Sequence, residues 1–423
     1  MTLWIMEPRD PLLVRDGRPF GPDPGARATS LPFPFPSTLA GGIRSRAGVD
    51  ENGIFQYIDR NEDTRQHLQR LKRLRVRGPL LVELAGDSGD IKLEEEQEAN
   101  GSKIPVPQYF LPAPSDALLL PVKNEATVRI QQLLPLELPP GAATDLDRQN
   151  LLFVGPTSDG EPEKPYANAP AYWSWKHFNT WLLKPSELAG TDLLPAQLGL
   201  RGLERDRRQH VSIDSDKEIA KDGTLFETSG LEFTTPGSGK QRLSSARRLA
   251  LALAAEDNEY EIHPGLTGFG GERRLSTWRK SSMELPKCSK ELEEAIVAAS
   301  HCRLLLLTPA CFQQGYLPQW LQEEAAHYGV TPGLKAIAVQ RPRIVSGWDL
   351  ELRRPKPSRR LVSAGTVLFL SLQGQPEALR EWIRSTWMQC ISDKEEDRID
   401  GFGLAILGTW SGIPLPMGRG SDR

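Results

Sequence analysis

Apolar stretches in this sequence are short: residues 304–307, for example, span no more than a β-strand. Helical periodicity follows some of these stretches, most clearly at residues 288–300 and 376–390. The segments expected to form strands are residues 2–6, 80–84, 210–214, 225–233, 247–256, 302–308, 335–341, 365–372 and 401–410. Residues 210–214 and 225–233 are expected to form a hairpin whose turn contains Asp222 and Gly223. Strands mixed with helices and with this hairpin predict an α+β fold that contains the split βαβ ferredoxin-like motif.

The length of 423 residues corresponds to about two or three domains. A duplicated ferredoxin-like unit with a large insertion fits this length, although the sequence shows no exact internal repeat. We expect the first domain to span residues 1–236, with an insertion at about 50–165. A basic helical stretch at 60–76 comes before the strand at 80–84, and from residue 86 to residue 165 the regular pattern gives way to loops and short strands. The second domain would span residues 237–423, after a candidate linker at 234–241.

The composition favours turns and long connections over a helical bundle, since the chain has 37 glycines and 35 prolines. No apolar run approaches the roughly 20 residues that a membrane-spanning helix needs. The first ten residues have no basic segment before Glu7, Arg9 and Asp10, unlike a signal peptide. We therefore expect a cytoplasmic protein.

Metal ions and cofactors are not expected. The cysteines at 288, 302, 311 and 390 are widely spaced, whereas zinc ligands usually come in close pairs. Asp214 and Asp216 resemble the start of a calcium loop, but Ile219 and Leu225 stand where that loop requires glycine and glutamate.

The net charge is only −3, yet the charges are unevenly distributed along the chain. Residues 60–77 and residues 341–360 each carry seven basic and two acidic side chains. The chain has 36 arginines and 16 lysines, and arginine binds phosphate bidentately and stacks on bases. A basic surface for nucleic acid is one explanation, and a bias in genomic base composition is the other.

Residues 265–280 combine four glycines, at positions 265, 268, 270 and 271, with Arg273, Arg274, Arg279 and Lys280. Glycine lets the backbone approach a ligand, and guanidinium groups complete an anion site, so we interpret this segment as a phosphate-backbone site. It lacks the third glycine of a dinucleotide fingerprint and the Gly-Lys-Ser/Thr of a Walker loop. The alternative is a glycine-rich turn beside an exposed basic strand.

Two further segments are candidates for contact with nucleic acid. In residues 341–365 several arginines and Lys356 surround Trp348, as backbone tracking combined with base stacking requires. The N-terminal loop carries Arg9, Arg15 and Arg18, and a short helix expected to be capped by Ser37 and Thr38 carries Arg44 and Arg46. A solvated loop and ordinary helix packing are the respective alternatives.

His210 is the one candidate for catalysis, as a general acid–base in RNA cleavage through the 2′-hydroxyl. A structural or binding role for a single histidine in a strand is the alternative. No HExxH or GxSxG motif of the common hydrolases occurs.

Six blocks of the sequence occur in an order that resembles one known family. They are EPRDPLLVRDGRPF, FPFPSTLAGGIRSRAG, HVSID with DGTLF, LTGFGGERR, VSGWDLE with KPSRRLVSAGTVLF, and GFGLAILGTW. Together they resemble the third RAMP-superfamily subunit of the Cmr complex, the type III-B CRISPR effector. Residues 50–165 resemble the family least.

The resemblance implies two ferredoxin-like (RRM-like) domains and a non-catalytic subunit that holds the 5′ tag of the CRISPR RNA (crRNA). It implies the large polymerase/cyclase-like subunit and the first backbone RAMP subunit as neighbours, with target RNA an indirect partner. Processing of precursor crRNA by a RAMP-type endoribonuclease is one alternative function, and a purely structural scaffold whose basic loops meet acidic partner proteins is another. The residues expected to bind RNA are Arg15, Arg18, Arg44, Arg46, His210, Gly268, Phe269, Gly270, Gly271, Arg273, Arg274, Arg279, Lys356 and Arg359.

Overall fold

The structure is a computed structural model, and it describes most of the chain. The described residues are 1–15, 27–50, 54–55, 62–86, 89–97, 103–123, 125–142, 144, 151–156, 163–235, 246–322, 327–349 and 354–417. Most of the expected linker at 234–241 therefore lies outside the described residues.

The chain forms two compact units, each assembled from three segments. Unit 1 comprises Met1–Gln108, Gly202–Glu284 and Ile344–Arg359, and unit 2 comprises Tyr109–Arg201, Leu285–Arg343 and Arg360–Arg423. This partition differs from the expected boundary at 236/237, because residues 247–255 pair with strands near the N-terminus. The expected insertion at 50–165 is divided as well, since its residues contribute to both units.

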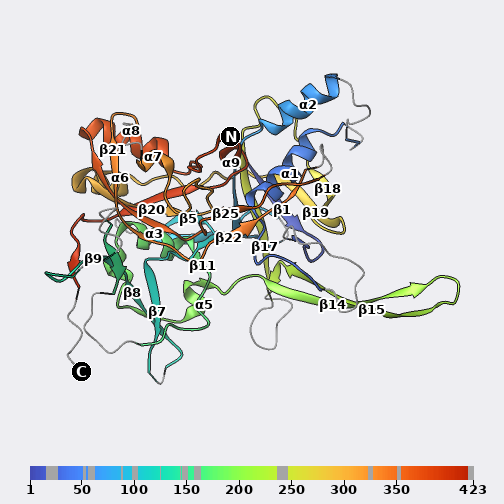
Figure 1. Cartoon of the computed structure of the whole chain (residues 1–423), viewed down its shortest axis with the longest axis horizontal. Helices are drawn as coiled ribbons and strands as arrows, with labels where there is room; N and C mark the ends of the chain where they lie inside the picture. Colours follow the sequence, from blue (N-terminus) through green and yellow to red (C-terminus); the bar gives the residue numbers. More distant parts are fainter. Residues whose placement is uncertain are drawn as a thin grey trace. The chain divides into compact units, whose positions relative to one another are not determined.

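The described residues of unit 1 form helices and strands around one antiparallel sheet (Figure 1). Its elements are β1 (Thr2–Pro8), β2 (Arg27–Thr29), α1 (Pro36–Ala47), α2 (Glu62–Lys72), β3 (Val76–Glu83), β4 (Leu93–Gln97), β5 (Lys103–Pro107), β14 (Glu204–Asp214), β15 (Ile219–Glu232), β16 (Thr234–Thr235), β17 (Arg247–Ala255), β18 (Gly265–Phe269), β19 (Arg274–Lys280), β23 (Trp348–Asp349) and β24 (Arg354–Pro355). Within this unit the strands of the sheet lie in the order β3-β17-β1-β19-β18.

Helix α1 packs against β18 and β19 at a glycine. A Cβ atom at Gly42 would lie 2.6 Å from Cε2 of Phe269 and 2.8 Å from Cζ2 of Trp278, so only glycine allows this approach. The helix begins differently from the expectation: Phe35 is its N-cap, Pro36 occupies the first turn, and no side chain caps the end. Proline suits that position because its ring already has a helical φ angle and the first turn needs no N–H donor.

Strands β14 and β15 form a long antiparallel ribbon in unit 1 (Figure 1), and the short strand β2 pairs parallel with β15. The expected turn at Asp222 and Gly223 is wrong, because both residues lie within β15 and the chain reverses between Asp214 and Ile219. A β-bulge between Val211 and Ile213 shifts the register near the turn.

Unit 2 is built around a second antiparallel sheet. Its elements are β6 (Tyr109–Pro112), β7 (Ala117–Pro121), β8 (Val128–Gln132), β9 (Leu134–Glu137), β10 (Phe153–Gly155), β11 (Tyr172–Ser174), α3 (Trp175–Leu183), α4 (Pro185–Leu188), β12 (Asp192–Leu193), α5 (Pro195–Leu198), β13 (Gly199–Leu200), α6 (Lys290–Ala299), β20 (His301–Leu306), α7 (Gln319–Gln322), β21 (Thr331–Ala338), β26 (Val367–Gln373), α8 (Pro376–Thr386), α9 (Glu395–Ile399), β27 (Ala405–Thr409) and β28 (Leu415–Pro416). β22 (Arg343–Val345) and β25 (Arg359–Leu361) lie where the chain passes between the units.

The main sheet of unit 2 has the strand order β21-β26-β20-β27. Because β20 lies between them and pairs antiparallel with both, β26 and β27 form a split βαβ motif with α8. In unit 1 the strands β3, β17, β1 and β19 follow the corresponding order, so the two units share one strand arrangement. The fold is mixed α and β, as expected. Among the described residues, no helix combines the length and the hydropathy that a membrane span requires.

Candidate RNA-binding surface

The glycine-rich turn between β18 and β19 is held by backbone contacts. Gly270 has a φ of +72°, and Glu272 and Arg273 also have positive φ values of 56° and 49°. A Cβ atom at Gly270 would lie only 2.7 Å from the carbonyl oxygen of Leu13. The backbone N–H of Gly271 donates a hydrogen bond of 2.6 Å to the same oxygen. These two glycines are therefore explained by the close approach of the N-terminal segment.

The N-terminal segment, residues 9–15, joins this turn to the β14–β15 ribbon. Leu12 and Leu231 of β15 exchange backbone hydrogen bonds of 2.8 and 2.9 Å. The next residue, Leu13, contacts Gly271 of the turn. The turn and the base of the ribbon consequently lie on either side of one extended segment of unit 1, although they are far apart in sequence.

Two arginines of α1 that were expected to bind RNA are engaged within the fold. Arg46 is 8% exposed and donates hydrogen bonds of 2.7 Å to the carbonyl of His263 and 2.6 Å to that of Pro264. Burial lowers the pKa of its guanidinium, which remains charged. Arg44 donates to the carbonyl of Leu74 at 3.0 Å. Both side chains fasten α1 to its neighbours.

Two arginines of β19 pair with carboxylates of their own unit. Arg279 Nη1 lies 2.9 Å from Oε2 of Glu7, whose other oxygen, Oε1, lies 2.5 Å from Arg248 Nη2. Burial would raise the pKa of Glu7, but hydrogen bonds and charge attraction from Arg248 and Arg279 outweigh it, so the pKa is lowered. Arg274 Nη2 lies 2.6 Å from Glu272. These guanidinium groups are committed to intrachain ion pairs.

Phe269 was expected to contact RNA, but its side chain is buried in the core. It is 6% exposed and packs edge-on against Trp278, with 5.8 Å between the ring centroids. Gly268 is the preceding residue of β18, and a Cβ atom at this position would contact Arg273.

Three of the expected cationic residues have exposed side chains: Arg15, Arg273 and Lys356. Within the part of the chain that the structure describes, the side chains of Arg273 and Lys356 form no ion pair or hydrogen bond. Arg359 is half-buried. Arg18 lies outside the described residues.

His210 lies on the ribbon, in β14. Its Nε2 atom is 2.9 Å from Oγ1 of Thr228, and its ring stacks on Phe226 with 5.0 Å between centroids and an angle of 14°. These contacts account for His210 as a packing and hydrogen-bonding residue. Arg207, on the other face of the same strand, is exposed and forms no ion pair with a described residue.

Sequence patterns missed some features of this surface. Arg207 lies in the run ERDRRQ, which is polar throughout, and this lack of apolar residues could have identified the strand as exposed. The link from Leu13 to Gly271 joins residues more than 250 positions apart, and no local pattern predicts it. Among the described residues, no group of three or more His, Cys, Asp or Glu side chains could hold a metal ion.

Comparison with known proteins assigns the chain to a family. Residues 4–410 match the family model described as CRISPR-associated protein (Cas_Cmr3), whereas no curated protein matches the sequence.

Similar solved structures include chains of the Type III-B Cmr-beta bound to cognate target RNA. With AMPPnP, the match has 15% identity, a TM-score of 0.42, and coverage of 87% of this chain and 86% of the other. For the structure without AMPPnP, the identity is 16%, the TM-score is 0.41, and the match covers 87% of this chain and 86% of the other. A chain of the Csm3–Csm4 subcomplex of the type III-A CRISPR-Cas interference complex matches with 9% identity, a TM-score of 0.35, and coverage of 87% and 92%.

The family match spans nearly the whole sequence and confirms the resemblance to the Cmr subunit drawn from the six sequence blocks. The chain belongs to the Cas_Cmr3 family of CRISPR-associated proteins.

Proposed function

We propose that this chain is a non-catalytic subunit of a type III-B Cmr complex and that unit 1 binds the 5′ tag of the crRNA. The observation that carries the proposal is the hydrogen bond from Gly271 to Leu13. Arg273 and Arg15 each lie two residues beyond this bond, and both side chains are exposed. Exposed guanidinium groups on a fixed backbone suit the phosphates and bases of single-stranded RNA.

The ribbon extends this surface within unit 1. Arg207 adds a third exposed guanidinium, and the 344–359 segment adds the ammonium group of Lys356. The contacts of His210 with Thr228 and Phe226 support a binding or structural role, and we assign it no part in cleavage.

The proposal includes the architecture and the partners. Both units are ferredoxin-like, RRM-like domains, which the shared strand order supports. The protein docks the large polymerase/cyclase-like subunit to the first backbone RAMP subunit in the cytoplasm, and it meets target RNA only through the crRNA.

A salt titration of RNA binding tests the assignment. Each phosphate contact in a single-stranded complex contributes about 0.7 to the slope of log K against log salt concentration. Arg273→Ala should reduce the slope for tag RNA by about 0.7. The matched variant Arg274→Ala removes the neighbouring guanidinium, which already pairs with Glu272, and should leave the slope nearly unchanged. Equal slopes for the wild type and Arg273→Ala would refute the site.

A further inference from the structure

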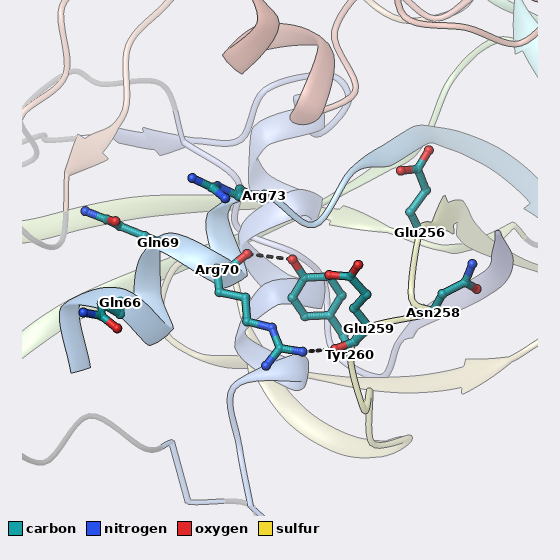
Figure 2. Close-up of a pocket in the computed structure, with 8 residues that line it drawn as sticks. All are labelled: Gln66, Gln69, Arg70, Arg73, Glu256, Asn258, Glu259 and Tyr260. Carbon is teal, nitrogen blue, oxygen red and sulfur yellow. Dashed lines mark hydrogen bonds between the residues drawn. The ribbon is translucent and has the colours of Figure 1, made fainter. Parts of the chain in front are cut away.

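A polar pocket in unit 1 lies between α2 and the connection that leads from β17 to β18 (Figure 2). It has a volume of about 700 Å³. Its walls are formed by Gln66, Gln69, Arg70, Arg73, Glu256, Asn258, Glu259 and Tyr260. None of these residues belongs to the surface around the glycine-rich turn.

The sequence builds one wall of the pocket from a single helix face. Gln66, Gln69, Arg70 and Arg73 are spaced at i, i+3, i+4 and i+7, so their side chains line up along α2 and its last turn. Leu71 lies on the inner side and is only 4% exposed. Burial of this side orients the helix, and the four polar side chains consequently lie on its exposed side, where they line the pocket.

The exposed side chain of Arg70 is held in a fixed orientation in the lining of the pocket. Its guanidinium carbon lies 5.5 Å from the centroid of the Tyr260 ring, and Nη2 donates a 2.5 Å hydrogen bond to the carbonyl of Glu259. The Tyr260 hydroxyl donates in return to the Arg70 carbonyl at 2.7 Å, as the dashed lines in Figure 2 show. A guanidinium plane fixed in this way is a platform on which a nucleobase can stack.

The remaining donors are available to a ligand. In the described part of the chain, the side chains of Gln66, Gln69, Arg73 and Asn258 make no hydrogen bond or ion pair. Arg73 offers a charge for a phosphate, and the three amides offer both donors and acceptors for the edge of a base.

The opposite wall of the pocket bears on whether the ligand is RNA or an acidic protein segment. Glu256 and Glu259 place carboxylates in the pocket, and Glu256 is only loosely paired, 3.8 Å from Arg77. These carboxylates repel the phosphates of RNA and the side chains of an acidic peptide alike, but a base offers exocyclic amino groups that donate hydrogen bonds to them, whereas an acidic side chain offers no such donor. The lining therefore favours a nucleotide over an acidic protein segment.

We infer that this pocket binds one nucleotide of a single-stranded RNA, with its base stacked on Arg70 and its phosphate paired with Arg73. This inference rests on the proposed function, because it adds a second RNA contact to the same unit. The pocket and the surface around the glycine-rich turn are formed by different residues, so separate variants test the two sites.

The test measures binding of the full chain to a fluorescently labelled single-stranded oligoadenylate over a series of salt concentrations. Arg73→Ala should lower the salt slope by about 0.7, as expected for one phosphate contact. Arg70→Lys keeps the charge but removes the planar platform, so it should leave the slope unchanged and weaken binding about tenfold at fixed salt. Gln69→Ala should weaken binding less, without a change of slope.

Arg201→Ala is the control, since this exposed arginine of unit 2 makes no ion pair with a described residue. Unchanged thermal melting would show that each variant folds. If the Arg73→Ala variant and the Arg70→Lys variant both bind the oligoadenylate as tightly as the wild type, the inference is overturned. Displacement of the RNA by polyglutamate at equal charge would overturn it as well. If Arg273→Ala weakens binding while both α2 variants do not, this inference fails and the proposed function stands. If the α2 variants weaken binding and Arg273→Ala does not, the glycine-rich turn is the wrong site and the pocket is supported.

Discussion

Arg303 and Asp116 form an ion pair in unit 2 in which both side chains are 0% exposed, with 2.5 Å between Nη1 and Oδ2. Arg303 lies in β20 and also donates to the carbonyl of Thr409 in β27 at 2.8 Å. Asp116 accepts a further 3.0 Å hydrogen bond from Nε1 of Trp181 in α3. The pair thus links the main sheet of unit 2, helix α3 and the turn before β7 through one set of satisfied polar groups.

Removing one member of this pair should destabilise the protein strongly. Asp116→Ala leaves the Arg303 charge buried without a counter-charge and the Trp181 N–H without its acceptor, a loss of about 3–5 kcal/mol. The double variant Arg303→Met/Asp116→Leu removes both charges and should lose less. Urea unfolding followed by tryptophan fluorescence measures the difference. Asp192→Ala, which breaks the exposed pair with Arg129, is the control and should hardly move the midpoint. A double variant as unstable as Asp116→Ala would contradict the account.

Alanine substitutions at two adjacent glycines of α1 should change the stability of the protein in opposite directions. Gly41 has nothing within 4 Å of an added Cβ, so Gly41→Ala should stabilise the helix by about 0.5–1 kcal/mol. Gly42→Ala forces a methyl group into the rings of Phe269 and Trp278 and should be destabilising by about 1–3 kcal/mol despite the better helix propensity. Thermal unfolding of the two variants measures both effects, and a stabilised Gly42→Ala would show that α1 does not pack closely on this hairpin.

The Glu7 ion pairs should give unit 1 a measurable dependence on acid pH. The pKa of Glu7 is lowered in the folded state from an ordinary value of 4.5. Its carboxylate therefore stabilises the fold fully above about pH 4.5, and this stabilisation disappears as the pH falls through the lowered pKa. Glu7→Gln should cost about 1.5–3 kcal/mol at pH 7, the contribution typical of hydrogen bonds to charged groups.

Denaturant midpoints of the wild type and Glu7→Gln, measured from pH 7 downward, check this prediction. The gap between the two proteins should narrow below about pH 4.5, because protonation then removes the charge from the wild type as well. Glu272→Gln, at an exposed carboxylate, is the control. A gap that stays constant into strong acid would mean that the Glu7 charge contributes nothing.

The elements with strong local patterns could be predicted from the sequence. Pro376 in the first turn and the apolar spacing that includes Leu379 and Ile383 identify α8, and both residues are buried on one face. Strand β17 is likewise evident from its apolar run. The turn of the ribbon was misplaced because Asp222-Gly223 resembles a hairpin turn, whereas the bulge near Val211 shifts the pairing and the reversal comes before Ile219.

The candidate site could be predicted only in outline. The arginines of residues 265–280 look equivalent in the sequence, but distant partners separate them: Glu7 binds Arg279 across 272 positions, while Arg273 is exposed. Arg46 is similarly engaged by His263, 217 positions away. Such pairings depend on tertiary structure, and no local spacing predicts them.

Cross-linking within the assembled complex tests the central claim most directly. The complex is purified from its host through a tag on this chain, with 4-thiouridine incorporated in the RNA, and cross-linked peptides and nucleotides are identified by mass spectrometry. We predict that nucleotides of the crRNA 5′ tag attach to peptides containing residues 269–275 or 9–15. Attachment of these peptides only to guide nucleotides, or of the 5′ tag only to other subunits, would contradict the account.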